Sequence, residues 1–215
     1  MVRERGRNRS GEATRQRILE AATALFAAGG YEATSLRQIA GAASVDLATL
    51  KYHVDDKPTL FAEVYRHGHA ELIGYVEPVL ALMSEVRSTE EMRASLRALV
   101  KNFHDFVEDN LPFVRMVLYR MLEDPANMSA LENELQGLAI AMADRTFDRL
   151  IRDGIIRPID TRALISFLVM ALPMFAVTCE VKPQWLGEPN PVMSEEGRQR
   201  SEAFFGDVLD RYFLS

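Results

Sequence analysis

Residues 35–54 carry the pattern that most restricts how this chain can fold: SLRQIAGAASVDLATLKYHV. The capping-box spacing at Ser35 predicts that a short helix begins there. Residues 42–44 predict a turn, and Asp46 is a favourable N-cap for a second helix that runs to about His53. Two short helices joined by a tight turn form a helix-turn-helix, whose second helix can enter the major groove of DNA. An ordinary helical hairpin fits the same pattern, so the flanking sequence has to decide between the two.

The flanks of this pair predict two more helices. Residues 14–29 (TRQRILEAATALFAAG) place apolar residues on one helical face, and Gly29 is the expected end of that helix. Residues 30–34 are the expected link to the pair. On the other side, Asp56 is a favourable cap and Pro58 suits the first turn of a long helix.

One combination of residues extends over this whole region. It is R-x-x-I-L-x-A-A-x-x-L-F-x-x-x-G-Y-x-x-T-S-x-R-x-I-A-x-A-A, then V-x-x-x-T-L, then Y-H-V-x-x-K-x-x-L, between Arg15 and Leu60. With this combination the chain resembles the TetR (tetracycline-repressor) family of transcriptional regulators. The resemblance implies a three-helix DNA-binding domain (residues 1–56) and a larger helical domain (residues 57–215) that dimerises and binds a small effector. Ser44 stands where the family usually has a turn glycine, so a residue expected in a left-handed conformation has a side chain.

The expected DNA contacts lie in the N-terminal domain. Thr34 and Ser35 are candidates to hold phosphates at a helix N-terminus, and Leu47 is a candidate to contact a thymine methyl group. Leu47 and Lys51 depart from the residues that the family usually has there, so the operator sequence is not predicted. The complete set is Thr34, Ser35, Arg37, Leu47, Thr49, Lys51, Tyr52, His53 and Lys57.

The distribution of charge agrees with a DNA-binding N-terminal region. Through residue 54 the chain has eight Lys and Arg against five Asp and Glu, a net charge of +3. The formal net charge of the whole chain is −6. Residues 2–9 contain four arginines and one glutamate. They form either a solvated tail or an arm that adds salt-dependent DNA contacts. No apolar run follows them, as a signal peptide would require.

The remainder of the chain predicts helices and no strands, so the expected fold is all-α. Long helices are expected over residues 57–83, 88–109 and 128–153, and further helices begin near residues 112, 160 and 194. Pro78 is expected to kink or interrupt the first of them. Ser88 and Glu91 have capping-box spacing, and Gly154 is the expected end of the third long helix.

Residues 163–179 (ALISFLVMALPMFAVTC) contain no charged side chain. Their length is at the lower limit for a membrane span, but Arg162 and Glu180 bound the run closely and Pro173 interrupts it. Burial against a second subunit explains the run more simply, because a helix that is apolar on all sides is a buried helix.

A homodimer is expected, since two-fold symmetric operators are bound by two recognition helices about 34 Å apart. The resemblance implies that the last two helices pair with those of the partner in a four-helix bundle. The candidate dimer residues are Phe167, Phe175, Phe204, Phe205, Val208, Leu209 and Tyr212.

The effector is expected to be small and apolar, because aromatic and methionine side chains are frequent in the larger domain and methionine adapts to irregular ligands. The candidate ligand-binding residues are Phe103, Phe106, Met116, Tyr119, Met142, Phe147, Met170 and Met174. Polar side chains that could orient an effector are His104, Arg115, Tyr119 and Arg120.

No catalytic or cofactor motif is evident, so an enzyme, a cofactor and a metal site are not expected. His67 and His69 lie two residues apart on a helix and therefore point in different directions. Cys179 is the only cysteine, lies in the apolar run, and fits a cytoplasmic protein.

These observations predict a ligand-responsive transcriptional regulator, in the usual sense of the family a repressor, that binds a palindromic operator as a homodimer. Two alternatives stay open. One is an all-α ligand-binding or scaffold protein whose N-terminal region no longer binds DNA. The residues that would suggest it are Ser44, Leu47 and the acidic Asp46, Asp55 and Asp56. The other is a regulator tethered to a membrane through residues 163–179.

Overall fold

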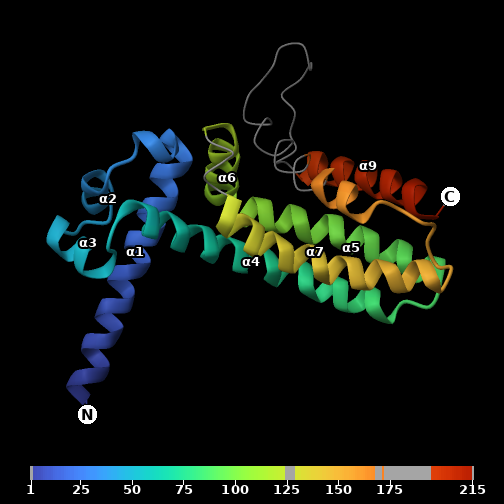
Figure 1. Cartoon of the computed structure of the whole chain (residues 1–215), viewed down its shortest axis with the longest axis horizontal. Helices are drawn as coiled ribbons and strands as arrows, with labels where there is room; N and C mark the ends of the chain where they lie inside the picture. The colour runs from blue at the N-terminus through green and yellow to red at the C-terminus, as the bar shows by residue number, and fades with distance from the viewer. Residues whose placement is uncertain (1, 124–128, 168–170, 172–194, 215) are drawn as a thin grey trace. The chain divides into compact units, whose positions relative to one another are not determined.

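The computed structural model describes residues 2–123, 129–167, 171 and 195–214, and every regular element in these residues is an α-helix (Figure 1). The chain divides into two compact units. The head unit consists of Met1–Gly68 and Pro112–Leu131, and the body unit consists of His69–Leu111 and Glu132–Ser215. The all-α prediction is therefore confirmed for the described part of the chain.

The head unit begins with α1 (Val2–Ala33), which is longer than predicted at both ends. It starts at Val2, so the basic residues 2–9 belong to this helix, whereas a tail or an arm was expected ahead of a helix that begins at Thr14. Its regular geometry breaks at Gly30, where φ is +78°, and not at Gly29 as expected. Glycine adopts this left-handed conformation without the steric cost that a Cβ atom imposes.

Helices α2 (Leu36–Ala42) and α3 (Leu47–His53) follow as the predicted pair. The core of the head unit is formed by one buried residue or more from each of its helices. Completely buried side chains include Ile18, Phe26, Ile39, Leu50 and Leu60.

Helix α4 (Lys57–Glu85) starts in the head unit and continues into the body unit. The Asp56 carboxylate accepts a hydrogen bond from the Thr59 backbone N–H at 2.8 Å, so the predicted cap is confirmed. The expected effect of Pro78 was a kink or an interruption, and the structure excludes the interruption, because Pro78 lies inside α4. Helix α6 (Leu111–Glu123) begins one residue before the predicted Pro112 and belongs largely to the head unit.

The body unit contains α5 (Thr89–Asp109), α7 (Ser129–Arg152), a helical segment at residues 161–167, and α9 (Glu195–Leu214). Helices α5 and α9 pack side by side (Figure 1). Ser88 caps α5 as predicted, but the Glu91 carboxylate accepts its hydrogen bond from the backbone N–H of Arg87. Gly154 has φ +69° directly after α7, as the predicted helix end requires.

Helix α7 also holds the C-terminal end of α4. The Arg149 guanidinium donates hydrogen bonds to the carbonyl oxygens of Met83 at 2.8 Å and Val86 at 3.2 Å. These are carbonyls that the end of a helix leaves without intrahelical partners. A long-range arginine thus replaces the local cap that the sequence around residue 86 lacks.

Much of the apolar run at residues 163–179 and the loop that follows lie outside the described residues, as does Pro125. Among the helices that are described, none combines the length and apolar character needed to cross a membrane.

Candidate nucleic-acid interface and effector cavity

The helix-turn-helix is fixed by hydrogen bonds at both of its helix starts. The Gln38 backbone N–H donates to Ser35 Oγ at 3.3 Å, and the Ser35 backbone N–H donates to Gln38 Oε1 at 2.8 Å, which completes the capping box. Asp46 Oδ1 accepts from the Thr49 backbone N–H at 2.6 Å. Hydrogen bonds from Thr49 lower the pKa of Asp46, so this carboxylate stays ionised as a cap.

The turn between these helices contains Ser44 with φ +55°, the left-handed conformation that was expected. A non-glycine residue adopts it at a steric cost, because Cβ approaches the following carbonyl oxygen. Leu50 is fully buried and anchors α3 to the head core. The turn and this anchor together determine which side of α3 faces solvent.

The solvent-facing side of α3 presents Ala48, Lys51 and Tyr52, and Tyr52 is 86% exposed. Leu47, Thr49 and His53 are partly exposed on the same short helix, and Arg37 is exposed on α2. Six of the nine predicted DNA contacts are therefore at least partly accessible on one helix pair: Arg37, Leu47, Thr49, Lys51, Tyr52 and His53.

Two other predicted contacts are engaged inside the head unit. Thr34 is 5% exposed, and its hydroxyl donates to the Gly30 carbonyl oxygen at 2.8 Å. Lys57 Nζ donates to the carbonyl oxygens of Tyr31 at 3.0 Å and Thr34 at 3.1 Å. This lysine therefore closes the C-terminal end of α1, and a phosphate would have to compete with those carbonyls. Ser35 is exposed, although its hydroxyl serves the cap.

Two acidic residues of the head, Asp46 and Asp56, have the capping roles that the sequence predicted. Asp46 and Asp56 each accept a backbone hydrogen bond at a helix start, and hydrogen bonds from Thr59 lower the pKa of Asp56. Carboxylates are favourable at this end of a helix because of the helix dipole. Their presence therefore does not by itself mark a head that has lost DNA binding.

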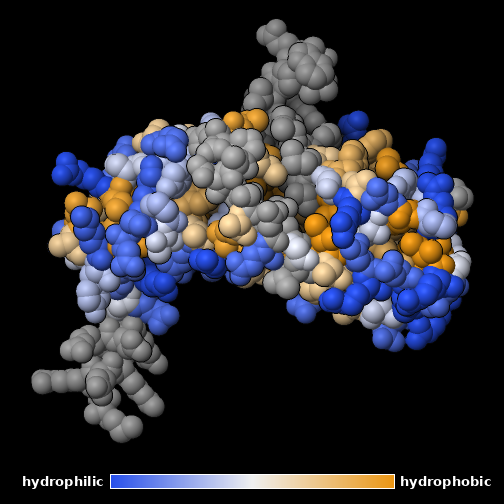
Figure 2. Space-filling view, in the orientation of Figure 1, coloured by the Kyte–Doolittle hydropathy of each residue, from blue (hydrophilic) through white to orange (hydrophobic). Residues whose placement is uncertain are grey.

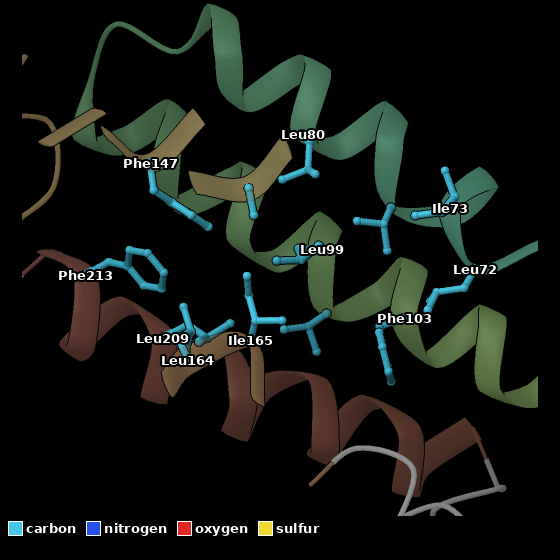
Figure 3. Close-up of a pocket in the computed structure, with 13 residues that line it drawn as sticks. Leu72, Ile73, Leu80, Leu99, Phe103, Phe147, Leu164, Ile165, Leu209 and Phe213 are labelled. Carbon is cyan, nitrogen blue, oxygen red and sulfur yellow. The ribbon is translucent and has the colours of Figure 1, made fainter. Parts of the chain in front are cut away.

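An apolar cavity of about 110 Å³ lies in the body unit (Figure 3). Helices α4, α5, α7, α9 and the 161–167 segment all contribute to its wall. Every described residue that lines it is aliphatic or phenylalanine: Leu72, Ile73, Val76, Leu80, Leu99, Val100, Phe103, Ala143, Phe147, Leu164, Ile165, Leu209 and Phe213.

The structure brings only part of the predicted ligand-binding set to this cavity. Phe103 and Phe147 line it, as Figure 3 shows. Phe106 is buried next to the rings of Phe103 and Tyr75 instead. Met142 borders a separate, more open hollow.

The remaining candidates lie elsewhere. Met116 and Tyr119 are on α6 in the head unit, as are Arg115 and Arg120, two of the proposed orienting side chains. Met170 and Met174 are outside the described residues. The prediction emphasised methionine and aromatic residues, whereas most of the wall is leucine, isoleucine and valine. The helical spacing of Leu72, Ile73, Val76 and Leu80 was visible in the sequence, but it could not distinguish a cavity wall from solid core.

Comparison with known proteins agrees with this architecture. Residues 18–64 match the sequence profile of the bacterial regulatory proteins, tetR family. HTH-type transcriptional activator FasR from Mycolicibacterium smegmatis is 26% identical over 195 residues, which cover 88% of this chain and 82% of that protein. Residues 18–64 therefore form a helix-turn-helix domain of the tetR family. The chain as a whole resembles DNA-binding transcriptional regulators.

Two further comparisons show the range of the chain's similarities. HTH-type transcriptional repressor KstR2 from Rhodococcus jostii is 32% identical over 94 residues, which cover 44% of this chain and 43% of that protein. The crystal structure of a TetR family transcription regulator from Marinobacter aquaeolei VT8 has a TM-score of 0.67 at 21% identity, covering 94% of this chain and 97% of that one. That likeness shows the shared fold. The relatives include an activator and a repressor, so the similarity leaves the direction of regulation open.

The body unit has an ion-pair network between α5 and α9. Arg198 of α9 pairs with Asp105 and with Glu108 at 3.0 Å, and also with Glu202 of its own helix at 2.9 Å. The Lys101 ammonium adds a pair with Asp105 at 2.7 Å. Opposite charges on facing helices therefore align α9 along α5.

His104 lies within this network with its side chain 10% exposed. Its Nε2 is 3.1 Å from Ser201 Oγ, and its Nδ1 is 3.7 Å from Glu202 Oε1 without forming a hydrogen bond. Burial lowers the pKa of His104, although the nearby carboxylates of Glu202 and Asp105 act in the opposite sense and Arg198 reinforces the effect. Ser201 is 4% exposed, so this histidine–serine pair cannot reach a substrate in solution. In the described part of the chain, no cluster of His, Cys, Asp and Glu could hold a metal ion.

The predicted dimer residues divide between the core and the surface of the body unit. Phe205 and Leu209 are buried within the chain, and Leu209 lines the cavity. Phe204 is 63% exposed and Phe167 is 52% exposed. Val208 and Tyr212 are partly exposed, and Phe175 is outside the described residues. Figure 2 shows hydrophobic residues among hydrophilic ones in the region of α9.

Proposed function

We propose that the chain is a ligand-responsive transcriptional regulator that binds a palindromic operator as a homodimer and releases it when a small apolar effector enters the body. The observation that carries the proposal is a helix-turn-helix, braced by caps and by the buried Leu50, whose second helix presents exposed Lys51 and Tyr52. In this family such a helix can enter the major groove. Repression is the sense of regulation that we propose.

The chemistry of the cavity supports an apolar effector. A polar group buried in a wall of aliphatic and phenyl side chains would lose its hydrogen bonds to water, at a cost of about 1–3 kcal/mol. The volume is about 110 Å³. An apolar cavity of about 150 Å³ is known to take up benzene or xenon, so a larger effector must displace part of the wall.

Helix α4 supports coupling between the effector and DNA. Its first half contributes Leu60 and Phe61 to the core of the head unit, and its second half contributes Leu72, Ile73 and Leu80 to the cavity wall. Any displacement of that wall therefore acts on a helix that is also part of the head. A coupling free energy of about 1–3 kcal/mol between the two sites would be enough for regulation.

The exposed phenyl rings support a second copy of the chain as the partner of α9. Phe204 and Phe167 are large apolar side chains exposed on the two C-terminal helical segments. Large exposed apolar patches often mark interaction sites, whereas single exposed apolar residues are normal on a protein surface. Phe204→Glu is expected to shift the chain from dimer to monomer in analytical ultracentrifugation. Leu82→Glu, at a residue 61% exposed on α4, is the matched control and is expected to stay dimeric.

DNA binding is tested by selecting duplexes from a random library and measuring their affinity by fluorescence anisotropy at low and high salt. We expect selective binding that weakens steeply with salt, because phosphate contacts release counterions. Lys51→Ala is expected to weaken binding and reduce the salt slope by about one. Lys101→Ala, which also removes an exposed lysine but in the body unit, is the control. Binding no tighter than to random duplexes would refute the proposal and favour the scaffold alternative.

Effector binding is tested with a panel of hydrophobic compounds from benzene to decanol, by thermal shift and by release of the selected duplex. Ala143→Leu places three more carbon atoms in the cavity and should abolish the thermal shift while DNA binding persists. Ala94→Leu, at an exposed position of α5, should leave the shift unchanged. If Ala143→Leu responds to the compounds like the wild-type chain, the effector does not bind in this cavity.

A further inference from the structure

Helix α6 occupies an unusual place in the connectivity of the two units. The chain passes between them three times: inside α4 after Gly68, after Leu111, and after Leu131. The described residues of the segment Pro112–Leu131, which are 112–123 and 129–131, therefore belong to the head unit, although the chain on either side of the segment belongs to the body unit. Whatever holds this segment on the head also restricts how freely the head can move.

The first contact that holds α6 is between the Phe113 ring and Gly68 of α4, which has no side chain. Phe113 is 8% exposed and lies so close to Gly68 of α4 that a Cβ atom at this glycine would be 2.2 Å from Phe113 Cδ2. The same ring meets the ring of Tyr65 edge to face, with centroids 5.8 Å apart. Met116, one turn further along α6, is 1% exposed.

The second contact is a buried arginine two helical turns after Phe113, on the same side of α6. The Arg120 guanidinium carbon is 5.0 Å from the centroid of the Tyr31 ring and 5.8 Å from that of Phe61. Both distances are within the range of cation–π attraction. The Lys57 ammonium also lies 4.2 Å from the centroid of the Tyr31 ring. Tyr31 directly follows Gly30, where the regular geometry of α1 breaks.

This arginine is poorly explained as a stabilising residue. Arg120 is 7% exposed, and its Nε has no hydrogen-bond partner among the described residues. Burying a cation costs several kcal/mol, whereas cation–π contacts return about 0.5–2 kcal/mol. An apolar side chain of similar size would fill the same space at a smaller desolvation cost. What the guanidinium adds is a directional contact with two rings of the head core.

We propose that Arg120 is a positioning residue for operator binding, which ties α6 to the head through the rings of Tyr31 and Phe61 and so narrows the half-site spacing that the dimer accepts. The inference rests on the proposed function, because it requires a dimer that binds a two-fold symmetric operator. A change of one base pair in the spacing rotates one half-site by about 35° relative to the other. A head that is tied at α6 as well as through α4 tolerates less of this rotation than a head tied through α4 alone.

The experiment measures affinity for the selected operator and for versions with one or two base pairs inserted or removed at its centre. The wild-type chain is compared with Arg120→Met, which keeps the bulk and removes the cation, and with Arg120→Lys, which restores a cation. Arg66→Met, at an exposed arginine of α4 in the same unit, is the matched control. A duplex with a single half-site reports on the recognition surface itself.

We expect the wild-type chain and Arg66→Met to lose affinity about tenfold or more when the spacing changes, and Arg120→Met to lose about threefold or less. Affinity for the single half-site should be the same in all four proteins, and Arg120→Lys should recover part of the spacing preference. An unchanged spacing preference in Arg120→Met would overturn the proposal. Equal losses at half-site and full operator would also overturn it, because they indicate a purely structural role.

Two controls keep the test decisive. If circular dichroism shows that Arg120→Met does not fold, Tyr31→Leu removes the same contact from the head side and must relax the spacing preference in the same way. If the wild-type chain selects no operator at all, the proposed function itself fails. A wild-type chain that selects an operator and an Arg120→Met variant that keeps its spacing preference would instead refute only the role of Arg120.

Discussion

Gly68→Ala tests the packing of α6 on α4 most directly. A methyl group at this position would stand 2.2 Å from Phe113 Cδ2 and 2.4 Å from its Cγ. Phe113 Cγ is bonded directly to Cβ and moves little when the ring rotates. Rotation of the ring therefore cannot remove the clash with the added methyl group, and one helix has to shift. Overpacking of a buried site costs about 1–3 kcal/mol.

The cost is opposed by the gain in helix propensity, since alanine is favoured over glycine inside a helix by about 1 kcal/mol. Gly74 provides the control, because it lies in the same helix and an added Cβ there meets no atom within 4 Å. Gly74→Ala should therefore stabilise the protein by about 1 kcal/mol. The propensity terms cancel between the two variants, so their difference isolates the overpacking of about 1–3 kcal/mol.

The assay is urea unfolding followed by circular dichroism at one fixed protein concentration, with midpoints and slopes compared. Phe113→Ala is added to complete a double-mutant cycle. In that background Gly68→Ala should become as favourable as Gly74→Ala, because the obstructing ring is gone. If Gly68→Ala and Gly74→Ala stabilise the protein equally with Phe113 present, the ring does not lie on the glycine and the reasoning is refuted.

Three further predictions concern single positions. Ser44→Gly should stabilise the head by up to about 1 kcal/mol, because it removes the steric cost of a positive φ, and Ser44→Ala should give no such gain in a thermal melt. Since burial lowers the pKa of His104, its neutral form is favoured in the folded state. Stability should therefore be complete above the ordinary histidine pKa of about 6.5 and decline as the pH falls below it, and His104→Gln should flatten that decline in melts between pH 5 and 8. A pH profile that His104→Gln leaves unchanged would contradict this account. Arg149→Met should destabilise the body by about 1–3 kcal/mol, because it leaves carbonyls at the end of α4 without donors, and an equal urea midpoint for variant and wild type would exclude that role.

The features that sequence reasoning predicted correctly depend on neighbours in the chain. The left-handed conformation of Ser44 was expected from the resemblance to the family, which usually has a turn glycine there. Ser35, Asp46 and Asp56 cap helices as their spacing indicated. Each of these depends on a few consecutive residues and on backbone hydrogen-bond rules that hold in any fold.

The features it did not predict depend on residues far apart in the chain. Lys57 suits a phosphate contact in sequence, but its ammonium binds carbonyls at the end of α1, more than twenty residues earlier. Arg149 caps α4 across more than sixty residues. The cavity wall is aliphatic because of how α4, α5, α7 and α9 converge, and periodicity alone cannot show where such helices leave space. Whether the accessible residues of α2 and α3 contact DNA stays a prediction.

The three passages of the chain between the units have a consequence for recombination within the family. A chimaera that takes its recognition helices from one regulator and joins them to another inside α4 would bring Gly68 and Tyr31 from one parent and Phe113 and Arg120 from the other. Those residues pack together in this chain, so we expect a graft of residues 1–68 alone to fail where the two parents differ at the α6 contacts. Exchange of DNA specificity should succeed when the graft also carries Pro112–Leu131. The part that has to be transferred therefore consists of two segments that are separate in the sequence.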